Sequence, residues 1–231
     1  MENKRRHRRR RRFIRRIKKV LILLFICFIG IKLIGLLIPE KNISFEATQM
    51  ADGLVDDGKS IIPEWIDIQL IEEGNPSRRG YRLEEVRDIV IHYVGNAQTT
   101  AQQNHDYYCH EDSDVASHFV VGMEGEVIMC LPLDEWSSAS NHRNKDTISI
   151  EVCHPDDTGK FTDETYASLV ELTSWLMDEF SLDSEHVIRH YDVTGKICPK
   201  YYVEHEESWE QFKEEVKKAY TVRKENENNR L

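Results

Sequence analysis

Apolar and polar positions alternate along the chain in a way that predicts strands interleaved with helices. Five apolar, β-branched runs indicate strands at residues 88–94, 117–122, 126–131, 147–153 and 186–190. The first run, DIVIHYV, is typical of a strand buried on both faces. The second and third runs are separated by Met-Glu-Gly, which predicts a hairpin.

Three segments carry an apolar stripe or composition that predicts helices, at residues 100–110, 163–180 and 207–220. In the second segment the stripe consists of Tyr166, Leu169, Val170, Thr173, Leu176, Met177 and Phe180. Thr162 precedes it as a predicted N-cap, and Asp163 and Glu164 suit the positive end of the helix dipole. Strands interleaved with helices predict an α/β layer fold around one sheet.

A separate apolar run at residues 20–38, VLILLFICFIGIKLIGLLI, predicts one transmembrane helix ahead of the globular part. Its nineteen residues have the length that a helix needs to cross a hydrocarbon core of ~30 Å. Lys32 is its only charge, and its long side chain can carry the ammonium toward the interface. Because the run exceeds the usual apolar region of a signal peptide and no small-x-small site follows it, an uncleaved anchor is favoured over a cleaved signal.

Charge is distributed very unevenly along the chain. Residues 1–19 hold twelve Lys or Arg and one Glu, so this head carries about +11 and the remainder about −21. The positive-inside bias keeps such a head in the cytoplasm and predicts a single-pass protein of the cell membrane with its carboxyl-terminal part outside. A basic head could also bind nucleic acid. Its position beside the span favours the topological role, and no nucleic-acid partner is expected.

The length of 231 residues suits one globular domain plus an anchor. The predicted organisation is a basic head at 1–19, a span at 20–38, a stalk and lead-in at 39–74, a globular domain at 75–220 and a frayed charged tail at 221–231. Five cysteines occur, at positions 27, 109, 130, 153 and 198, and none forms a CxxC pair. An oxidising exterior permits a disulfide among Cys109, Cys130 and Cys153, and the sequence leaves their state open.

Three side chains in the strand-rich part are suited to binding a metal. His92 lies within an apolar strand, His190 ends a later strand, and Cys198 follows a Thr-Gly turn. Zinc hydrolases use three such ligands, an open fourth position and a nearby base, and α/β sheets gather sites at strand ends. The alternative is that each histidine is a hydrogen-bonded structural residue and that Cys198 is a small buried hydrophobe. These residues alone leave both interpretations open.

Four blocks occur in order along the chain: IVIHYVGN, ASHFVVGMEGEVIMCLPLDEW, TISIEVCHP and VIRHYDVTGKICP. Together they resemble the zinc-dependent N-acetylmuramoyl-L-alanine amidases related to phage amidase lysozymes and peptidoglycan recognition proteins. The resemblance covers roughly residues 75–198 and implies a single mixed β-sheet flanked by helices. It also implies that the domain hydrolyses the amide joining N-acetylmuramic acid to L-alanine in bacterial peptidoglycan or muropeptides.

Position by position, the resemblance implies that His92, His190 and Cys198 bind zinc. Glu151 matches the catalytic carboxylate, and Lys196 matches the basic residue that holds the developing oxyanion. A glutamate in an apolar strand is costly unless it is paired or functional, so a salt bridge is the alternative for Glu151. A solvated loop residue is the alternative for Lys196.

Members of the wider family that lack a complete metal site bind peptidoglycan without cutting it, which makes a non-catalytic wall-binding module the rival hypothesis. The presence of both Cys198 and Glu151 argues against it. The sequence departs from many relatives at Ser137-Ser138, where they carry Trp-His before an alanine, and at Cys198, where Asp is frequent.

Several further side chains have weaker assignments. Trp136 and Asn141 are candidate substrate contacts. His118 matches a family histidine that either borders the cleft or packs inside the domain. Asp192 either orients a ligand or caps the following turn. The remaining histidines of this region are expected on the surface, at positions 105, 110, 142 and 154.

Overall fold

The computed structural model describes residues 61–229. The predicted head and the predicted span lie outside the described residues, as do residues 39–60 of the predicted stalk and lead-in and the last two residues of the tail. Within residues 61–229, no helix combines the length and the apolar character needed to cross a membrane.

One six-stranded sheet organises the domain, in the order β1-β4-β3-β5-β2-β6. Its strands are β1 (Ile66–Ile68), β2 (Asp88–Ile91), β3 (Phe119–Val121), β4 (Val127–Met129), β5 (Thr147–Val152) and β6 (Val187–Arg189). The pair β3–β4 is antiparallel and the other neighbouring pairs are parallel, which confirms a mixed sheet and the hairpin. The edge strand β1 was not predicted, because only Ile66 of its three residues is buried and so short a run shows no period.

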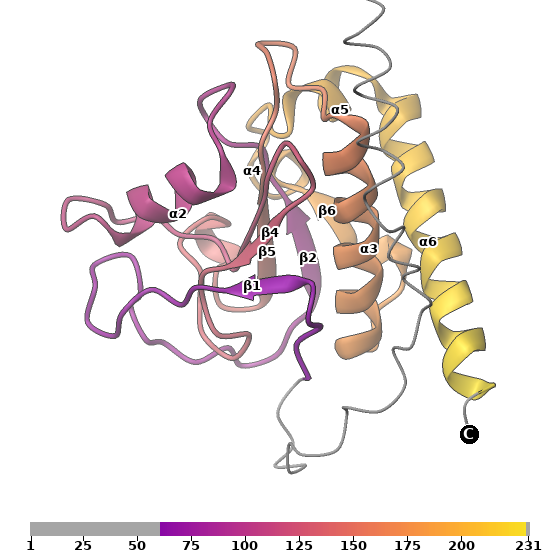
Figure 1. Ribbon diagram of the computed structural model, residues 1–231, viewed down its shortest axis with the longest axis horizontal. Coiled ribbons are helices and arrows are strands. Elements are labelled where there is room, and N and C mark those ends of the chain that lie inside the picture. Colours follow the sequence, from indigo (N-terminus) through magenta and orange to yellow (C-terminus); the bar gives the residue numbers. More distant parts are fainter. Residues whose placement is uncertain (1–60, 230–231) are drawn as a thin grey trace, which may run out of the picture. The chain divides into compact units, whose positions relative to one another are not determined.

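Helices cover both faces of the sheet (Figure 1). Helix α2 (Ala101–Cys109) lies on one side, and α3 (Asp163–Glu179) and α6 (Glu206–Asn228) lie on the other. Thr162 caps α3 as predicted, since its side chain accepts a hydrogen bond from the Thr165 backbone N–H. The arrangement confirms an α/β fold with one mixed sheet between helical layers.

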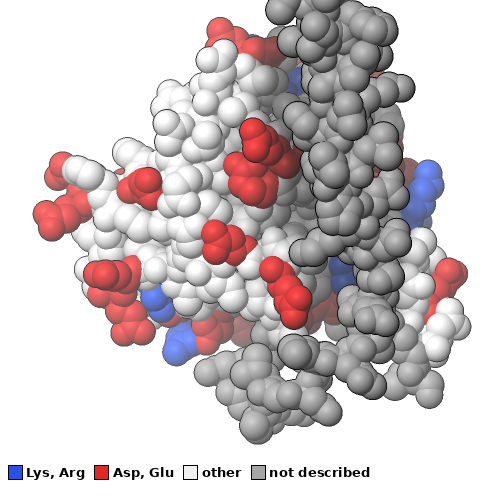
Figure 2. Space-filling model, in the orientation of Figure 1, with Lys and Arg blue, Asp and Glu red and all other residues white. Residues whose placement is uncertain are grey.

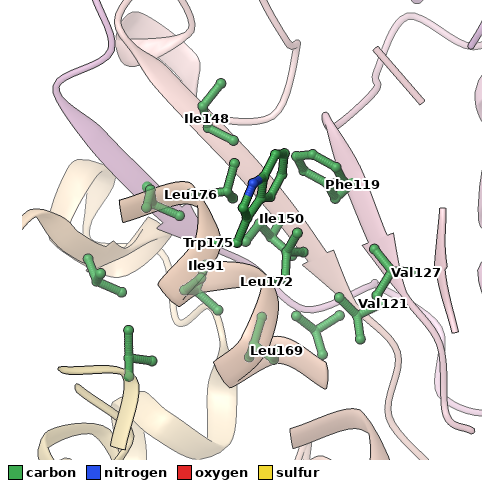
Figure 3. Close-up of a cluster of buried hydrophobic side chains, with 14 of the residues drawn as sticks. Ile91, Phe119, Val121, Val127, Ile148, Ile150, Leu169, Leu172, Trp175 and Leu176 are labelled. Atoms are coloured by element: carbon green, nitrogen blue, oxygen red, sulfur yellow. The ribbon is translucent and has the colours of Figure 1, made fainter. Parts of the chain in front are cut away.

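The hydrophobic core is divided between the two faces of the sheet. Phe119 and Val121 point toward α3 and join the larger cluster, where the Phe119 and Trp175 rings meet edge-on with centroids 6.2 Å apart (Figure 3). Val120, between them, faces α2 and packs with Tyr108. This alternation follows from the two-residue period of a strand and explains why β3 is buried on both faces.

Helix α6 continues to Asn228, so the prediction of a frayed tail from residue 221 is wrong. The Thr221 hydroxyl donates to the Lys217 carbonyl, and Lys224 pairs with Asp178 of α3 and with Glu227. Residues 221–228 have no apolar stripe, and these polar contacts hold them in the helix and against α3.

Four short helical segments were also not predicted: η1 (Asn141–Arg143), η2 (Ser184–His186), α4 (His190–Thr194) and α5 (Lys200–Glu204). The cysteines at positions 109, 130, 153 and 198 are all free thiols, which answers the disulfide question for the described residues.

Acidic side chains are spread over the face of the domain shown in Figure 2. Lys and Arg side chains appear mainly near its margins, and the described residues visible in that view form no large basic patch. The distribution agrees with the acidic excess that the sequence places after residue 19.

Candidate metal centre

Strands β2 and β6 are parallel neighbours, and the two predicted histidine ligands follow their carboxyl-terminal ends. His92 comes directly after β2, and His190 is the first residue of α4, directly after β6. His190 therefore begins a helix, whereas the sequence pattern placed it at the end of a strand. Cys198 lies between α4 and α5, and the ligand atoms of the three residues lie within 4.8 Å of one another.

Asp192 explains how α4 begins at this point. Its carboxylate accepts from the Arg189 backbone N–H at 2.8 Å and pairs with the Arg189 guanidinium. Of the two alternatives for Asp192, its observed contacts favour a role in shaping the turn. Gly195 ends the helix with a φ of +78°, a conformation that glycine adopts without steric cost.

The donor atoms fit a zinc ion in both type and spacing. The His92 Nδ1 and His190 Nδ1 atoms are 3.1 Å apart. Tetrahedral zinc with Zn–N bonds of 2.0–2.1 Å would hold two imidazole nitrogens about 3.3 Å apart. His92, His190 and Cys198 are 1%, 5% and 1% exposed, so the three donors converge in a buried site. Two imidazoles and a thiol form the kind of three-ligand set that catalytic zinc sites use.

Burial determines the charge of these donors. It lowers the pKa of His92 well below its ordinary value, and the nearby His190 and Lys196 charges lower it further. Burial also lowers the pKa of His190 to about 4. Both imidazoles are therefore neutral at pH 7, the form in which histidine binds metals. Burial raises the pKa of the Cys198 thiol to about 12, so this group needs a nearby cation to become a thiolate.

Glu151 reaches the same place from β5, which lies beside β2 in the sheet. Its Oε1 atom is 3.9 Å from His92 Nδ1, and its Oε2 atom is buried with no hydrogen-bond partner among the described residues. Burial raises the pKa of this carboxyl to about 8, and the Lys196 charge opposes that shift. A buried carboxylate oxygen without a partner costs stability, which argues against a purely structural salt bridge.

Lys196 is exposed on the segment between His190 and Cys198. Its positive charge is near enough to lower the pKa of His190 and Glu151. Lys196 can therefore place an ammonium group at the solvent side of the buried donors.

The loop before β5 also contacts the two histidines. Asn141, which is exposed, lies with its Oδ1 atom 2.8 Å from His190 Nε2. Ser140, which is buried, lies with its Oγ atom 3.3 Å from His92 Nε2. Sequence reasoning missed Ser140 and treated Asn141 only as a candidate substrate contact. No local pattern marks them, because their position depends on how the loop returns to the sheet.

Other predicted side chains lie in different surroundings. Trp136 packs against the Tyr81 ring, with centroids 5.1 Å apart, and its indole N–H donates to the Arg82 carbonyl. His118 is fully buried with hydrogen bonds at both ring nitrogens, which favours its packing role over a role in the cleft.

The surface prediction holds for two of the four remaining histidines and is wrong for the other two. His110 and His142 are exposed. His105 and His154 are buried because each ring bonds a backbone carbonyl, that of Gln69 and that of Val94 respectively.

Comparison with known proteins places this geometry in context. A family described as N-acetylmuramoyl-L-alanine amidase matches residues 82–201. The chain is 28% identical over 158 residues to the N-acetylmuramoyl-L-alanine amidase CwlL of Bacillus licheniformis, and the alignment covers 61% of this chain and 43% of CwlL. It is also 28% identical over 162 residues to the N-acetylmuramoyl-L-alanine amidase BlyA of Bacillus subtilis (strain 168), and that alignment covers 61% of this chain and 44% of BlyA. The chain thus spans less than half the length of these curated relatives.

Solved structures show the same fold. The catalytic domain of XlyA superposes with a TM-score of 0.58 at 25% identity, covering 65% of this chain and 98% of that domain. The structure of PlyL gives a TM-score of 0.59 at 22% identity, which supports the fold alone.

Proposed function

The chain belongs to the N-acetylmuramoyl-L-alanine amidase family, whose match spans residues 82–201, and we propose that it hydrolyses the amide between N-acetylmuramic acid and L-alanine in peptidoglycan. The observation that carries the proposal is the convergence of the buried donors His92, His190 and Cys198 beside Glu151, whose Oε2 atom has no hydrogen-bond partner among the described residues. These residue types in this arrangement suit metal-assisted hydrolysis of an amide.

We propose that His92, His190 and Cys198 hold a zinc ion. When bound, zinc would polarise the substrate carbonyl and make water a stronger nucleophile at neutral pH. Their spacing and neutral imidazoles support this choice, and the nearby dication would favour the thiolate form of Cys198.

Glu151 is the proposed proton carrier. Burial keeps much of this carboxyl protonated at pH 7, and a dication held by the three donors would favour its ionised form. The carboxylate would then take a proton from the attacking water and pass it to the amino group of the L-alanine that begins the leaving stem peptide. The side chain is 19% exposed, so it faces the donors while retaining some access to the solvent side. Lys196 would lie against the carbonyl oxygen as negative charge develops on it, which stabilises the tetrahedral state.

We further propose that residues 20–38 anchor the enzyme in the cell membrane, with the head inside and the catalytic domain outside. This proposal rests on the sequence pattern, and the anchor would keep the enzyme beside its substrate. Protease added outside intact cells should then cleave the catalytic domain of the parent, and reversing the charge of residues 1–19 should protect that domain from cleavage. Equal cleavage of both proteins would contradict this topology.

The activity is tested with the full chain, purified in mild detergent and loaded with zinc, acting on purified peptidoglycan. The parent should release stem peptides that begin with L-alanine, whereas Glu151→Gln and Cys198→Ser should release almost none. Glu214→Gln, a change at an exposed glutamate of α6, is the matched control and should behave as the parent. A parent that binds no zinc and retains intact wall without releasing peptides would show a binding module instead.

A further inference from the structure

Two consecutive residues of the loop between β4 and β5 each contact one histidine of the proposed metal centre. Ser140 Oγ lies 3.3 Å from His92 Nε2, and Asn141 Oδ1 lies 2.8 Å from His190 Nε2. In both rings the contact is made at Nε2, which leaves the two Nδ1 atoms facing each other at 3.1 Å. The loop therefore holds the far side of both rings while their near sides form the donor set.

The Asn141 contact determines which nitrogen of His190 carries the proton. A carboxamide oxygen can only accept a hydrogen bond, so His190 Nε2 must be the donor in this pair. A neutral imidazole with its proton at Nε2 has a free lone pair at Nδ1. Asn141 thus prepares His190 to bind a metal through Nδ1 before any metal arrives.

The Ser140 contact works differently, because a hydroxyl can donate or accept. Without a metal, His92 can donate from Nδ1 to His190 Nδ1 while the Ser140 hydroxyl donates to His92 Nε2. With a metal at Nδ1, the His92 proton must lie on Nε2, where Ser140 Oγ can accept it. Ser140 therefore accommodates both tautomers, whereas Asn141 enforces one.

The loop that carries these two residues is held in place by its own contacts. The Ser140 backbone N–H donates to Asn144 Oδ1 at 2.7 Å, and the Thr147 hydroxyl donates to the Arg143 carbonyl. Arg143 pairs with Asp146 and with Asp88 at the start of β2. Asn141 itself has a φ of +54°, a left-handed conformation that asparagine tolerates better than most residues. The two side chains are therefore positioned before metal binding.

We propose that Ser140 and Asn141 are positioning residues that set the orientation and tautomer of the two histidine ligands, with Asn141 contributing more. This inference rests on the proposed zinc site. It changes the role of Asn141 from a candidate substrate contact to a partner of His190. Residues that orient metal ligands in this way typically change metal affinity by about 10- to 100-fold when they are removed.

The test measures zinc affinity of the full chain by competition with a chromophoric chelator, and the visible absorption spectrum after cobalt replaces zinc. Asn141→Gly keeps the left-handed backbone and removes the carboxamide, so it should weaken zinc binding about 10- to 100-fold and alter the cobalt spectrum. Asn141→Asp keeps an acceptor oxygen and should restore affinity to near the parent value. Ser140→Ala should weaken binding less than Asn141→Gly does.

The matched control is Ser181→Gly, which introduces glycine at another exposed position whose φ is +53° and which lies at the end of α3. It should leave zinc affinity unchanged. Unfolding followed by tryptophan fluorescence shows whether each variant is folded. If Asn141→Gly is unstable, Ser140→Ala decides the matter, because it removes the contact to His92 without changing the backbone. If parent and Asn141→Gly bind zinc equally with the same cobalt spectrum, the positioning role is refuted while the zinc site stands. A parent without zinc affinity overturns both.

Discussion

His118 predicts a specific loss of stability in mild acid. The ring is fully buried between two fixed partners. Its Nε2 atom lies 2.9 Å from the Glu135 carbonyl oxygen, which can only accept, so Nε2 carries the proton. The unprotonated Nδ1 atom then accepts from the Ser149 backbone N–H at 3.0 Å. A second proton at Nδ1 would break that bond and place an unpaired charge in the core.

The magnitude follows from the pKa of this ring. Burial lowers the pKa of His118 from 6.5 to about 4, with a smaller opposing effect from the Glu135 backbone. Between these two pH values the unfolded chain binds the proton and the folded chain does not, so stability falls as the pH falls. At about 1.4 kcal/mol for each unit of pKa, the loss between pH 7 and pH 4.5 should be about 2.5 kcal/mol.

The assay is urea unfolding at several pH values, followed by tryptophan fluorescence, with parent and His118→Gln compared after zinc removal. All four tryptophans lie within the described residues, so the signal reports this domain. His118→Gln should be less stable than the parent at pH 7 by roughly 1–2 kcal/mol, because it loses the bond at Nδ1. That difference should shrink by about 2.5 kcal/mol toward pH 4.5 and can change sign. A constant difference across this range would refute the reasoning, because His92 and His190 titrate in both proteins.

Three further predictions concern stability and use the same unfolding assay at pH 7. Arg78 and Glu135 form a hydrogen-bonded ion pair with side chains only 9% exposed. Glu135→Leu alone should lower the free energy of unfolding by about 3 kcal/mol, and the double change with Arg78→Met should lower it much less. Equal losses would contradict a buried pair. Gly125→Ala should cost roughly 1–3 kcal/mol, because φ is +85° and the new Cβ would lie 2.8 Å from Ser168 Oγ; an unchanged unfolding midpoint would exclude this strain. Phe119→Ala should cost roughly 3–5 kcal/mol. The control is Tyr107→Ala, at a residue 58% exposed, which should cost under about 1 kcal/mol. If Phe119→Ala and Tyr107→Ala lower stability equally, Phe119 is not a core residue.

The sequence predicts the central architecture because its strands are long or strongly apolar. Strands β2 and β5 and the β3–β4 hairpin consist of β-branched runs, and α3 has a continuous stripe with a capping threonine. Strand β1 escapes prediction because it is defined by pairing with β4 and has no pattern of its own. The end of α6 escapes because its stabilising contacts involve polar side chains on a neighbouring helix.

For the candidate site, the sequence predicts residues that the fold brings together and misses others that contact them. His92, Glu151 and His190 are conspicuous because each is a polar residue beside an apolar strand. Ser140 has no such signal, since a serine in a polar loop is ordinary until the fold places it 3.3 Å from His92. His105 and His154 show the opposite error, because backbone carbonyls of distant segments satisfy and bury rings that the local sequence presents as polar.

The sheet order explains why these separated residues meet. The parallel strands β5, β2 and β6 are consecutive neighbours, and Glu151, His92 and His190 lie at or just beyond their carboxyl-terminal ends. Such a site costs stability, because it buries two neutral histidines and the Oε2 atom of Glu151, which has no hydrogen-bond partner within residues 61–229. The apolar clusters on both faces of the same strands can offset that cost. The three strands thus fix the donors rigidly and support their burial, while the loop before β5 orients the two rings.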